Sequence, residues 1–592
     1  MSEAWIAAFV REVEGQLQWH GYRRPKHVWT ASNVADVLPL MEEVEAAVEF
    51  GLHAAGYLAF EAAPAFDPNL QVHPPGDLPL AWWALFEGEP ESLEGQGTVL
   101  QPNWVPLKWV PRVSRSNYGR AIERIHAAIA AGETYQVNYT FPLDANFDGD
   151  PMAWTWHLQA VQKSAHAAFI DTGPFAICSA SPELFFELNG DELTTRPMKG
   201  TARRGLYPAE DIRRIEELRD SQKNRAENVM IVDMMRNDLG RISEPGTVRV
   251  DSLFDVETYP TVHQMTSTVR AQTTARPVDI LKALFPPSSI TGAPKQRTME
   301  LIRELEPYPR GVYTGTMGWL HPGRRASFNV AIRTATLDRQ TAIVRYGTGG
   351  GIVWDSRAEE EYEECRTKAL VLGAGWPAFD LLETLLWRPR SGYFLLRRHL
   401  RRLEGSAAYF GIRLDLEQVH RTLTNAVIGG STPGRVRLTV SRDGEPRVAV
   451  TPLPDSLPRT CWHLVLDDRP TDSANVLLYH KTTHRQVYDE ALERHPGAEE
   501  VLLWNEKEEL TESTRANLVL RLEGEWFTPP VSCGLLGGTL RQVLVDRGRV
   551  RERTLPVACL REATEILLVN SVRGLIRVNP AVPGKLAPQG GA

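Results

Sequence analysis

A short stretch rich in glycine and proline, Gly373-Ala-Gly-Trp-Pro377, separates two parts of this chain whose sequence signals differ. Glycine and proline favour breaks between structural elements, and a fresh helix start and new strands follow this stretch. The chain has 592 residues, which is more than a single hydrophobic core usually supports. We therefore predict a domain boundary near residue 374, between a first domain over residues 1–374 and a second over residues 375–592.

The composition excludes several classes of protein. Hydrophobic residues make up 42% of the chain and charged residues 24%, as in ordinary globular proteins. The formal net charge of −8 argues against a nucleic-acid-binding surface. The five cysteines include no Cys-x-x-Cys pair, so we expect reduced thiols and no structural zinc. Because no targeting segment and no run of about 18 apolar residues is present, we expect a cytoplasmic protein without membrane partners.

Two periodicities predict the elements of the first domain. Apolar residues at helical spacing predict a helix over 116–131, with Ser116 as its N-cap and Gly132 as its end. The same spacing predicts one long helix from about Ala209 to Leu239. Alternating runs bounded by turn residues predict strands at 56–61 and 81–86, in an N-terminal subregion (1–112), and at 134–140 and 328–334, in a core (113–372).

A predicted hairpin carries the first candidate catalytic residues. Its first strand covers Leu184–Leu188, Asn189-Gly190-Asp191 forms the turn, and the second strand ends at Met198. Lys199 then follows the strand and precedes Gly200, and Glu183 lies before the hairpin. A lysine after a strand is more often a solvated surface residue, so this pattern alone is weak evidence.

Carboxylates on two predicted helices suggest a metal site. Glu227 shares one helix face with Asn224 and Asn228, and Glu361 and Glu364 lie three apart on a helix that begins near Ser356. Two helices that each present a carboxylate can hold a hard cation such as Mg²⁺. Taken separately, such glutamate runs are usually solvated helix faces, and the glycine loop 347–351 is poor evidence of phosphate binding.

The order of seven separate runs resolves this ambiguity, because residues 56–372 closely resemble the chorismate-utilising enzymes. That group includes the large subunit of anthranilate synthase, component I of aminodeoxychorismate synthase, and the isochorismate and salicylate synthases. The matching runs are Gly132–Asn138, Ser179–Glu183, Lys199–Thr201, Ala226–Gly240, Ser289–Lys295, Phe328–Thr334 and Gly349–Ser356. One departure is Ser288, where relatives usually have glycine, and we expect it to alter a turn rather than the chemistry.

The resemblance implies an α/β fold with two facing sheets, flanking helices and a chorismate site between the sheets. It implies that Glu227 and Glu364 bind Mg²⁺, with Glu361 close by, and that His263 lies beside the reacting ring. Substrate-binding roles are implied for Gln136, Thr201, Thr291, Arg333, Gly347 and Gly349.

Two positions indicate the branch of this family. Members that add water carry a lysine where this chain has Gln136, so Gln136 favours the addition of ammonia. Members that make anthranilate carry alanine where this chain has Lys199, and a lysine there resembles component I of aminodeoxychorismate synthase. The resemblance implies that Lys199 attacks C2 of chorismate while Glu183 helps the C4 hydroxyl leave. Because no cysteine here resembles the nucleophile of a glutamine amidotransferase, it also implies a separate glutaminase subunit.

The second domain carries residue types that pyridoxal phosphate requires. These are a lysine for the Schiff base, an acid for the pyridine nitrogen, and groups for the phosphate. Most of residues 376–592 resemble the fold-type IV pyridoxal-phosphate enzymes, with two α/β subdomains and a dimer through this domain. The resemblance assigns these roles to Lys481, Glu512 and Arg402, and completes the phosphate site with Thr539 and Ser571. Gly538 stands where relatives often have proline.

The two resemblances together imply a bifunctional enzyme that makes 4-aminobenzoate for folate synthesis. The first domain would aminate chorismate, and the second would release pyruvate from 4-amino-4-deoxychorismate, with Lys481 also carrying protons. Motifs in the second domain separate a lyase poorly from a transaminase, so the fusion itself decides this interpretation. Two alternatives remain open, which are an anthranilate synthase joined to an aminotransferase and a non-catalytic second domain.

Overall fold

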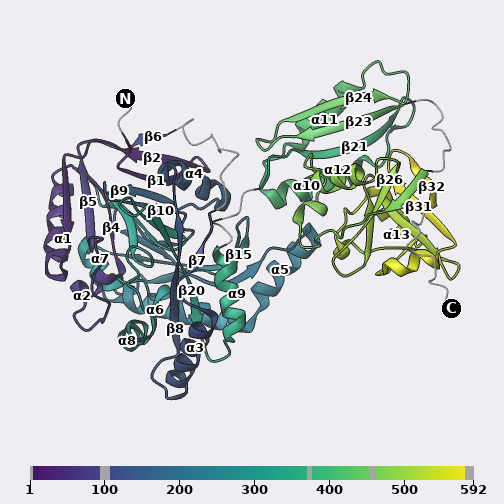
Figure 1. Cartoon of the computed structure of the whole chain (residues 1–592). Helices are drawn as coiled ribbons and strands as arrows, with labels where there is room; N and C mark the ends of the chain where they lie inside the picture. Colours follow the sequence, from purple (N-terminus) through teal and green to yellow (C-terminus); the bar gives the residue numbers. More distant parts are fainter. Residues whose placement is uncertain (1–3, 94–106, 370–371, 373–375, 454–461, 581–592) are drawn as a thin grey trace. The chain divides into compact units, whose positions relative to one another are not determined.

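The polypeptide separates into two compact units in the computed structural model, which describes residues 4–93, 107–369, 372, 376–453 and 462–580 (Figure 1). Unit 1 consists of Met1–Arg204 and Arg214–Gly375, and unit 2 of Gly205–Arg213 and Trp376–Ala592. The predicted boundary near residue 374 falls within 373–375, outside the described residues.

Unit 1 is built on two antiparallel ten-stranded sheets. The first contains, in order, β16 (Gly292–Ala293), β8 (Gln136–Asn146), β20 (Ile343–Ile352), β19 (Thr334–Asp338), β10 (Phe175–Ser179), β9 (Ala168–Asp171), β1 (Ala7–Val13), β2 (Gln16–Tyr22) and β6 (Glu91–Ser92), with β7 (Val110–Pro111) on β8. The second contains β13 (Met198–Arg203), β15 (Val262–Gln272), β12 (Glu192–Arg196), β11 (Leu184–Asn189), β18 (Arg325–Val330), β17 (Thr316–His321), β4 (His53–Leu58), β5 (Ala81–Phe86) and β3 (His27–Ala31), with β14 (Arg249–Thr258) on β15.

The two sheets face each other across a shared hydrophobic core. Phe9 on β1 and Ile177 on β10, from the first sheet, pack in one cluster with Tyr57 on β4 and Trp82 on β5, from the second. Burial of such side chains contributes about 1.5–3 kcal/mol each and is the main force that holds the layers together. The predicted architecture of two facing sheets is confirmed.

Helices pack against both sheets and flank this core (Figure 1). On the second sheet, α6 (Gln222–Gly240) packs on β13 and β15, and on the first sheet α9 (Ala358–Ala369) packs on β20 and α3 (Arg115–Ala130). The remaining longer helices of unit 1 are α1 (Val34–Glu49), α4 (Pro151–Gln162), α7 (Pro277–Leu284) and α8 (Lys295–Leu305). Helix α5 (Pro208–Asp220) begins in the segment Gly205–Arg213 of unit 2 and ends in unit 1.

Two predicted helix boundaries were wrong. The helix expected from Ala209 to Leu239 breaks between α5 and α6, because Ser221 leaves the helical conformation and its Oγ accepts the backbone N–H of Asn224. A serine in this position satisfies a helix N-terminus that would otherwise lack a partner. At α3 the N-cap is Ser114 rather than Ser116, since the Ser114 Oγ accepts from the Asn117 N–H at 3.2 Å.

Strand predictions were right in kind and sometimes wrong in extent. The strand expected at 81–86 is β5, the one expected at 134–140 overlaps β8, and the one expected at 56–61 overlaps β4, which ends at Leu58 before a 3-10 turn. The strand expected over 328–334 is instead the end of β18 and the start of β19, which belong to different sheets. Lys199 does not follow the hairpin but lies inside a third strand, β13, because Pro197 has no N–H and separates β12 from β13.

Unit 2 contains two subdomains, as predicted. The strands of a four-stranded sheet follow the order β22 (Gly392–Tyr393), β21 (Leu381–Arg388), β23 (Gly434–Val440) and β24 (Pro446–Pro452). This sheet packs against α10 (Leu396–Phe410) and α11 (Leu416–Ala426). The strands of an eight-stranded sheet follow the order β27 (Leu510–Ser513), β26 (Glu500–Trp504), β25 (Trp462–Leu466), β32 (Gly574–Pro580), β31 (Glu565–Asn570), β28 (Asn517–Leu522), β29 (Glu525–Thr528) and β30 (Arg551–Glu552). Helix α12 (Gln486–Arg494) contacts β26, and α13 (Thr539–Asp546) contacts β31.

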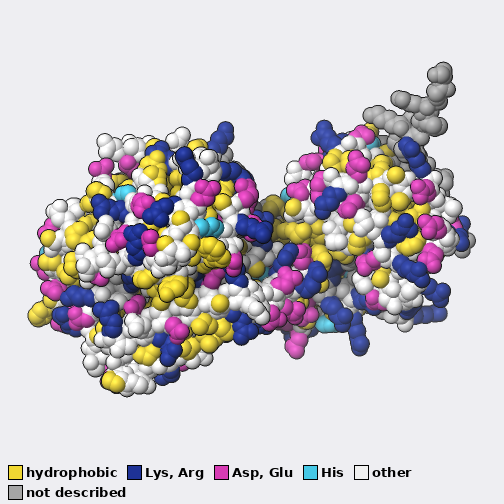
Figure 2. Space-filling view, turned by 90° about the horizontal axis from the view of Figure 1, so that it is seen from below, with side chains coloured by type: hydrophobic (Ala, Val, Ile, Leu, Met, Phe, Trp, Pro, Cys, Tyr) yellow, Lys and Arg dark blue, Asp and Glu magenta, His cyan; other side chains and the backbone are white. Residues whose placement is uncertain are grey.

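The surface is mixed in charge on the face that Figure 2 presents, where basic and acidic side chains are interspersed over both units. Among the described helices, none combines the length and the apolar character needed to cross a bilayer. The four cysteines within the described residues are free and buried.

Candidate active sites

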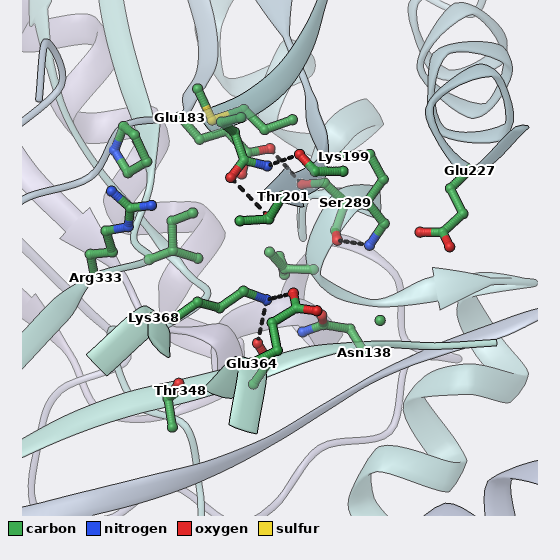
Figure 3. Close-up of a pocket in the computed structure, with 18 of the residues that line it drawn as sticks. Asn138, Glu183, Lys199, Thr201, Glu227, Ser289, Arg333, Thr348, Glu364 and Lys368 are labelled. Carbon is green, nitrogen blue, oxygen red and sulfur yellow. Dashed lines mark hydrogen bonds and ion pairs between the residues drawn. The ribbon is translucent and has the colours of Figure 1, made fainter. Parts of the chain in front are cut away.

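A cavity of about 160 Å³ in unit 1 gathers side chains that are far apart in sequence (Figure 3). Lys199 enters it from β13, Glu227 from α6 and Glu364 from α9. Glu183, just before β11, and Arg333, between β18 and β19, also line it. The two facing sheets therefore bring one lysine, one arginine and several carboxylates to a single space.

Glu183 is a buried acid that can hold a proton near neutral pH. Its side chain is buried, and its Oε1 accepts a hydrogen bond from the Ser289 Oγ at 2.7 Å. Burial raises the pKa of Glu183 to about 7, although the bond from Ser289 opposes this rise. Near pH 7 a large fraction of this carboxyl is therefore protonated and can act as an acid.

Lys199 lies in the same cavity, where its amine is easier to deprotonate than in water. Burial lowers the pKa of Lys199, and the negative charge of Glu227 offsets part of this shift. The Lys199 Nζ reaches the Ser289 carbonyl oxygen at 3.5 Å. A neutral amine is the form that a nucleophile needs.

The glycine run 347–351 is part of strand β20 and not a loop, so that prediction was wrong. Its glycines permit close packing. A Cβ on Gly347 would lie 2.1 Å from the Tyr313 ring, and one on Gly351 would lie 2.3 Å from the Gln136 Nε2 and 2.7 Å from the Lys199 Nζ. Gln136 is buried, and both its amide atoms lack a hydrogen-bond partner among the described residues. Its amide therefore has bonding capacity left for a ligand beside Lys199.

The three predicted metal ligands all line this cavity. Burial raises the pKa of Glu227 and of Glu361, whose Oε1 accepts from the Ser356 Oγ at 2.6 Å. The Lys368 ammonium lies 2.9 Å from Glu364 and lowers the pKa of that carboxyl. In the described part of the chain Glu227 makes no hydrogen bond or ion pair. Clustered carboxylates, one of them unpaired and destabilised by burial, fit a hard divalent cation.

The remaining predicted residues divide into two sets. Arg333, Thr201, Gly347 and Gly349 line the cavity, and the Arg333 guanidinium donates to Gln162. Gln136, described above, lies beside it. His263 and Thr291 are buried but do not line the cavity. The neighbour of His263, Gln264, does line it and accepts a hydrogen bond from Thr201 at 3.0 Å.

A second cavity of about 350 Å³ lies in unit 2 and is lined by all five residues predicted there: Lys481, Glu512, Arg402, Thr539 and Ser571. Glu512 accepts hydrogen bonds from the Tyr488 hydroxyl at 2.9 Å and the Leu536 N–H at 3.0 Å. Burial raises the pKa of Glu512 to about 7, and burial together with Arg402 lowers the pKa of Lys481 to about 8. A buried acid, an easily deprotonated lysine and a group of side chains that can donate hydrogen bonds to a phosphate fit pyridoxal phosphate.

Two buried residues that contact the lining of this cavity, Glu383 and His399, were not predicted from the sequence. Glu383 receives both arms of the Arg402 guanidinium at 2.8 and 2.7 Å and lies 2.6 Å from the His399 Nδ1. The other ring nitrogen of His399 lies 3.2 Å from the Thr539 hydroxyl. Burial alone would raise the pKa of Glu383, but Arg402 outweighs it and the pKa falls to about 2. A lone acid in the apolar strand β21 was the available signal.

Gly538, which replaces the usual proline, has a structural reason to be small. A Cβ there would lie 1.8 Å from the Asn517 Oδ1, whose amide also donates to Glu512. The glycine therefore lets Asn517 pack directly against the start of α13. In unit 1, the unusual Ser288 donates a hydrogen bond to Asp238 at 3.3 Å.

Comparisons with known proteins agree with this geometry. Residues 7–372 match the family model for chorismate binding enzymes, and residues 380–580 match amino-transferase class IV. A class IV amino-transferase region implies pyridoxal phosphate as its cofactor.

Curated relatives align with the first part of the chain. Aminodeoxychorismate synthase component 1 of Klebsiella aerogenes is 42% identical over 258 residues, which are 43% of this chain and 57% of the relative. Aminodeoxychorismate synthase of Streptomyces griseus is 42% identical over 276 residues, 46% of this chain and 37% of the relative. The chain thus spans about half the length of the curated relatives it matches.

A solved structure supports the fold of unit 1. Anthranilate synthase component I from Streptococcus pneumoniae is 25% identical, with a TM-score of 0.50 over 62% of this chain and 90% of that chain. The family predicted from the seven sequence runs is confirmed. The chain belongs to the chorismate binding enzyme family and carries, on the C-terminal side of that region, a class IV amino-transferase region.

Proposed function

We propose that this chain makes 4-aminobenzoate in two steps, for folate synthesis. Unit 1 aminates chorismate to 4-amino-4-deoxychorismate, and unit 2 cleaves this product to 4-aminobenzoate and pyruvate. The observation that supports the first step is that Lys199 and Glu183 share one cavity, each shifted by burial toward its neutral form. Anthranilate synthesis is the runner-up, and a lysine in this position argues against it.

The first step uses the neutral states of both residues. The Lys199 amine attacks C2 of chorismate, the two ring double bonds shift, and the C4–O bond breaks. Glu183 supplies the proton with which the hydroxyl leaves as water. Ammonia then adds to C4, the double bonds shift back and the Lys199 amine leaves C2, while Glu183 recovers a proton from the new ammonium group.

Charge recognition would hold the substrate during these steps. Glu227 and Glu364, with Glu361 nearby, would hold Mg²⁺, which supplies positive charge for the ring carboxylate. Arg333 would bind the carboxylate of the enolpyruvyl group, because its buried guanidinium already lines the cavity. Gln136 would orient the incoming ammonia through its unpaired amide.

The second step would use the cavity of unit 2. Lys481, Glu512, Arg402, Thr539 and Ser571 would hold pyridoxal phosphate, which supplies an electron sink for the substrate amine. Lys481 removes the proton from C4 of the ring, the C3–O bond breaks, and Lys481 returns a proton to the methylene carbon of the departing enolpyruvate. The ring becomes aromatic and pyruvate is released. A separate glutaminase subunit, a homodimer through unit 2 and a cytoplasmic location also belong to this proposal.

Product identification from chorismate, Mg²⁺, ammonium and pyridoxal phosphate tests both steps. The wild-type chain should release 4-aminobenzoate and pyruvate in equal amounts, detected by mass and fluorescence. Lys481→Ala should accumulate 4-amino-4-deoxychorismate and lose the covalent cofactor absorbance at about 410–430 nm. Lys199→Ala should form neither product, and Lys282→Ala, on the surface of α7, should behave like wild type. Anthranilate as the wild-type product would contradict the assignment of unit 1, and an unchanged Lys481→Ala that of unit 2.

A further inference from the structure

The cavity of unit 2 contains more positive charge than pyridoxal phosphate accounts for. Its lining includes one carboxylate, Glu512, among seven cations: Arg402, Arg435, Arg437, Lys481, Arg485, Arg515 and Arg573. The predicted cofactor site uses only Arg402 and Lys481 of these. A concave surface with such an excess of one charge concentrates ligands of the opposite charge.

Of the five other arginines in this lining, two have polar protein partners and three have no carboxylate partner among the described residues. Arg485 donates to the Thr514 carbonyl at 2.6 Å, and Arg515 lies 3.6 Å from Glu500. By contrast, in the described ranges no carboxylate lies within 4 Å of Arg435, Arg437 or Arg573. These three guanidinium groups are exposed and remain available to an anion.

Strand β23 places two of these arginines on one face. Arg435 and Arg437 are two residues apart, so their side chains leave the strand on the same side. The alternating residues Val436 and Leu438 are buried in the core of the small subdomain, which fixes the orientation of the strand. Thr384, the partner of Arg437 on β21, also lines the cavity. The arginine pair is therefore built into the cavity wall by the register of the sheet.

The third arginine approaches from the other subdomain. Arg573 follows β31, and its guanidinium lies 5.0 Å from the centroid of the Trp462 ring, which lines the same cavity. Stacking on an aromatic ring steadies a guanidinium and leaves its edge free to bind a carboxylate. The neighbouring Ser571 belongs to the predicted phosphate site, so a ligand held by Arg573 would lie near the cofactor.

We infer that Arg435, Arg437 and Arg573 form a carboxylate subsite that selects a dicarboxylate amine as the substrate of unit 2. Guanidinium groups bind carboxylates through two parallel hydrogen bonds, and two or three of them suit a ligand with two carboxylates. The inference rests on the proposed function, because 4-amino-4-deoxychorismate carries a ring carboxylate and an enolpyruvyl carboxylate. An ordinary amino acid with an apolar side chain carries only one and would leave part of the subsite unpaired.

Calorimetry with two probes tests the subsite on the full chain loaded with pyridoxal phosphate. The probes are 3-(carboxymethoxy)benzoate, which carries a ring carboxylate and an ether-linked carboxylate, and benzoate, which carries one. EDTA is present, so that the proposed metal-dependent site of unit 1 does not compete. The wild-type chain should bind the dicarboxylate about tenfold more tightly than benzoate, since a charged hydrogen bond contributes at least this much.

The variants Arg435→Met and Arg437→Met should each weaken binding of the dicarboxylate by about tenfold and that of benzoate much less. Both residues are exposed, so folding and the cofactor absorbance should not change. The control is Arg551→Met on β30, which removes one exposed arginine of the same unit outside this cavity. The subsite is refuted if a chain carrying both Arg435→Met and Arg437→Met binds the dicarboxylate as tightly as wild type, or if wild type does not distinguish the probes.

The proposed lyase reaction can fail independently of the subsite. If wild type releases no pyruvate from added 4-amino-4-deoxychorismate but keeps its arginine-dependent preference, the subsite stands and serves a different dicarboxylate amine. If pyruvate is released with a KM that the two arginine variants leave unchanged, the lyase reaction stands and the subsite is wrong.

Discussion

At the scale of single residues, burial sets the chemical state of the groups in both cavities. Each cavity pairs a lysine whose pKa is lowered with a glutamate whose pKa is raised to about 7, namely Lys199 with Glu183 and Lys481 with Glu512. Desolvation is the first cause of all four shifts, and it favours the neutral form of every group. Neutral amines and neutral acids are what nucleophilic attack and proton transfer require near pH 7.

The amination step should therefore show a bell-shaped dependence on pH. At low pH Lys199 is protonated and cannot attack, and as the pH rises past about 7 Glu183 loses the proton that the leaving hydroxyl needs. The initial rate of 4-amino-4-deoxychorismate formation, measured at a constant concentration of free ammonia, checks this. Glu183→Gln should lower the rate by about 100-fold or more and flatten one limb. A rate that keeps rising through alkaline pH in wild type would contradict the role of Glu183.

Glu383 offers a prediction about stability. Glu383→Gln should lower the free energy of unfolding of unit 2 by about 3 kcal/mol at neutral pH, because it leaves the partly buried Arg402 and the buried His399 without their anion. The pKa of Glu383 is held at about 2 in the folded chain, below its ordinary value of 4.5. Its contribution is thus complete above pH 4.5 and is lost as the pH falls toward 2. Thermal unfolding of both proteins between these pH values should show the difference shrinking, whereas Glu404→Gln, on the exposed side of α10, should match wild type throughout.

At the scale of elements, apolar spacing predicted where helices and strands lie, but it missed a helix break set by one side chain and features set by contacts between distant parts of the chain. Apolar spacing located α6, but the break before it depends on Ser221 turning its side chain onto Asn224. The glycines of β20 looked like a loop, because Tyr313 and Gln136, the neighbours that require small residues, come from remote parts of the chain. The motif runs predicted Lys199 and Glu183, whereas Glu383 is signalled only as a lone acid in an apolar strand, and the β23 arginines only by strand alternation.

The packing of β20 predicts the effect of one methyl group. Gly351→Ala should reduce amination by about 100-fold, because its Cβ would lie 2.7 Å from the Lys199 Nζ and must displace the amine. Gly350→Ala is the matched control on the same strand, since its Cβ would meet its nearest neighbour, the Glu361 Oε2, at 3.4 Å. Initial rates and thermal unfolding of both variants separate catalysis from folding. Equal rates for the two variants would show that the position of Lys199 does not depend on Gly351.

The carboxylates that α6 and α9 place in the unit 1 cavity lead to a prediction about how amination depends on the Mg²⁺ concentration. Removing one carboxylate should raise the Mg²⁺ concentration needed for half-maximal amination by about tenfold, because a hard cation depends on its anionic ligands. Glu227→Gln tests α6 and Glu364→Gln tests α9. Glu360→Gln, on the exposed face of α9, should leave the titration unchanged. A titration unaltered by both cavity variants would place the metal elsewhere or exclude it from the reaction.

At the scale of the whole molecule, each cavity is lined by residues of one unit only. A substitution in one cavity should therefore leave the other site complete. Lys199→Ala retains the whole lining of the unit 2 cavity, and Lys481→Ala retains that of the unit 1 cavity. The two sites are linked through the covalent chain and through the intermediate that one makes and the other consumes.

Mixing the two inactive variants should consequently restore 4-aminobenzoate formation. Lys481→Ala releases 4-amino-4-deoxychorismate into solution, and Lys199→Ala takes it up and cleaves it. Because the intermediate must first accumulate to the KM of unit 2, the fluorescence of 4-aminobenzoate should appear after a lag that shortens as the Lys199→Ala concentration rises. Each variant alone, supplied with chorismate, should form none, and Lys199→Ala alone should convert added 4-amino-4-deoxychorismate without a lag. If the mixture stays inactive although Lys481→Ala accumulates the intermediate, the second site needs a residue or a transfer route that only an intact chain provides.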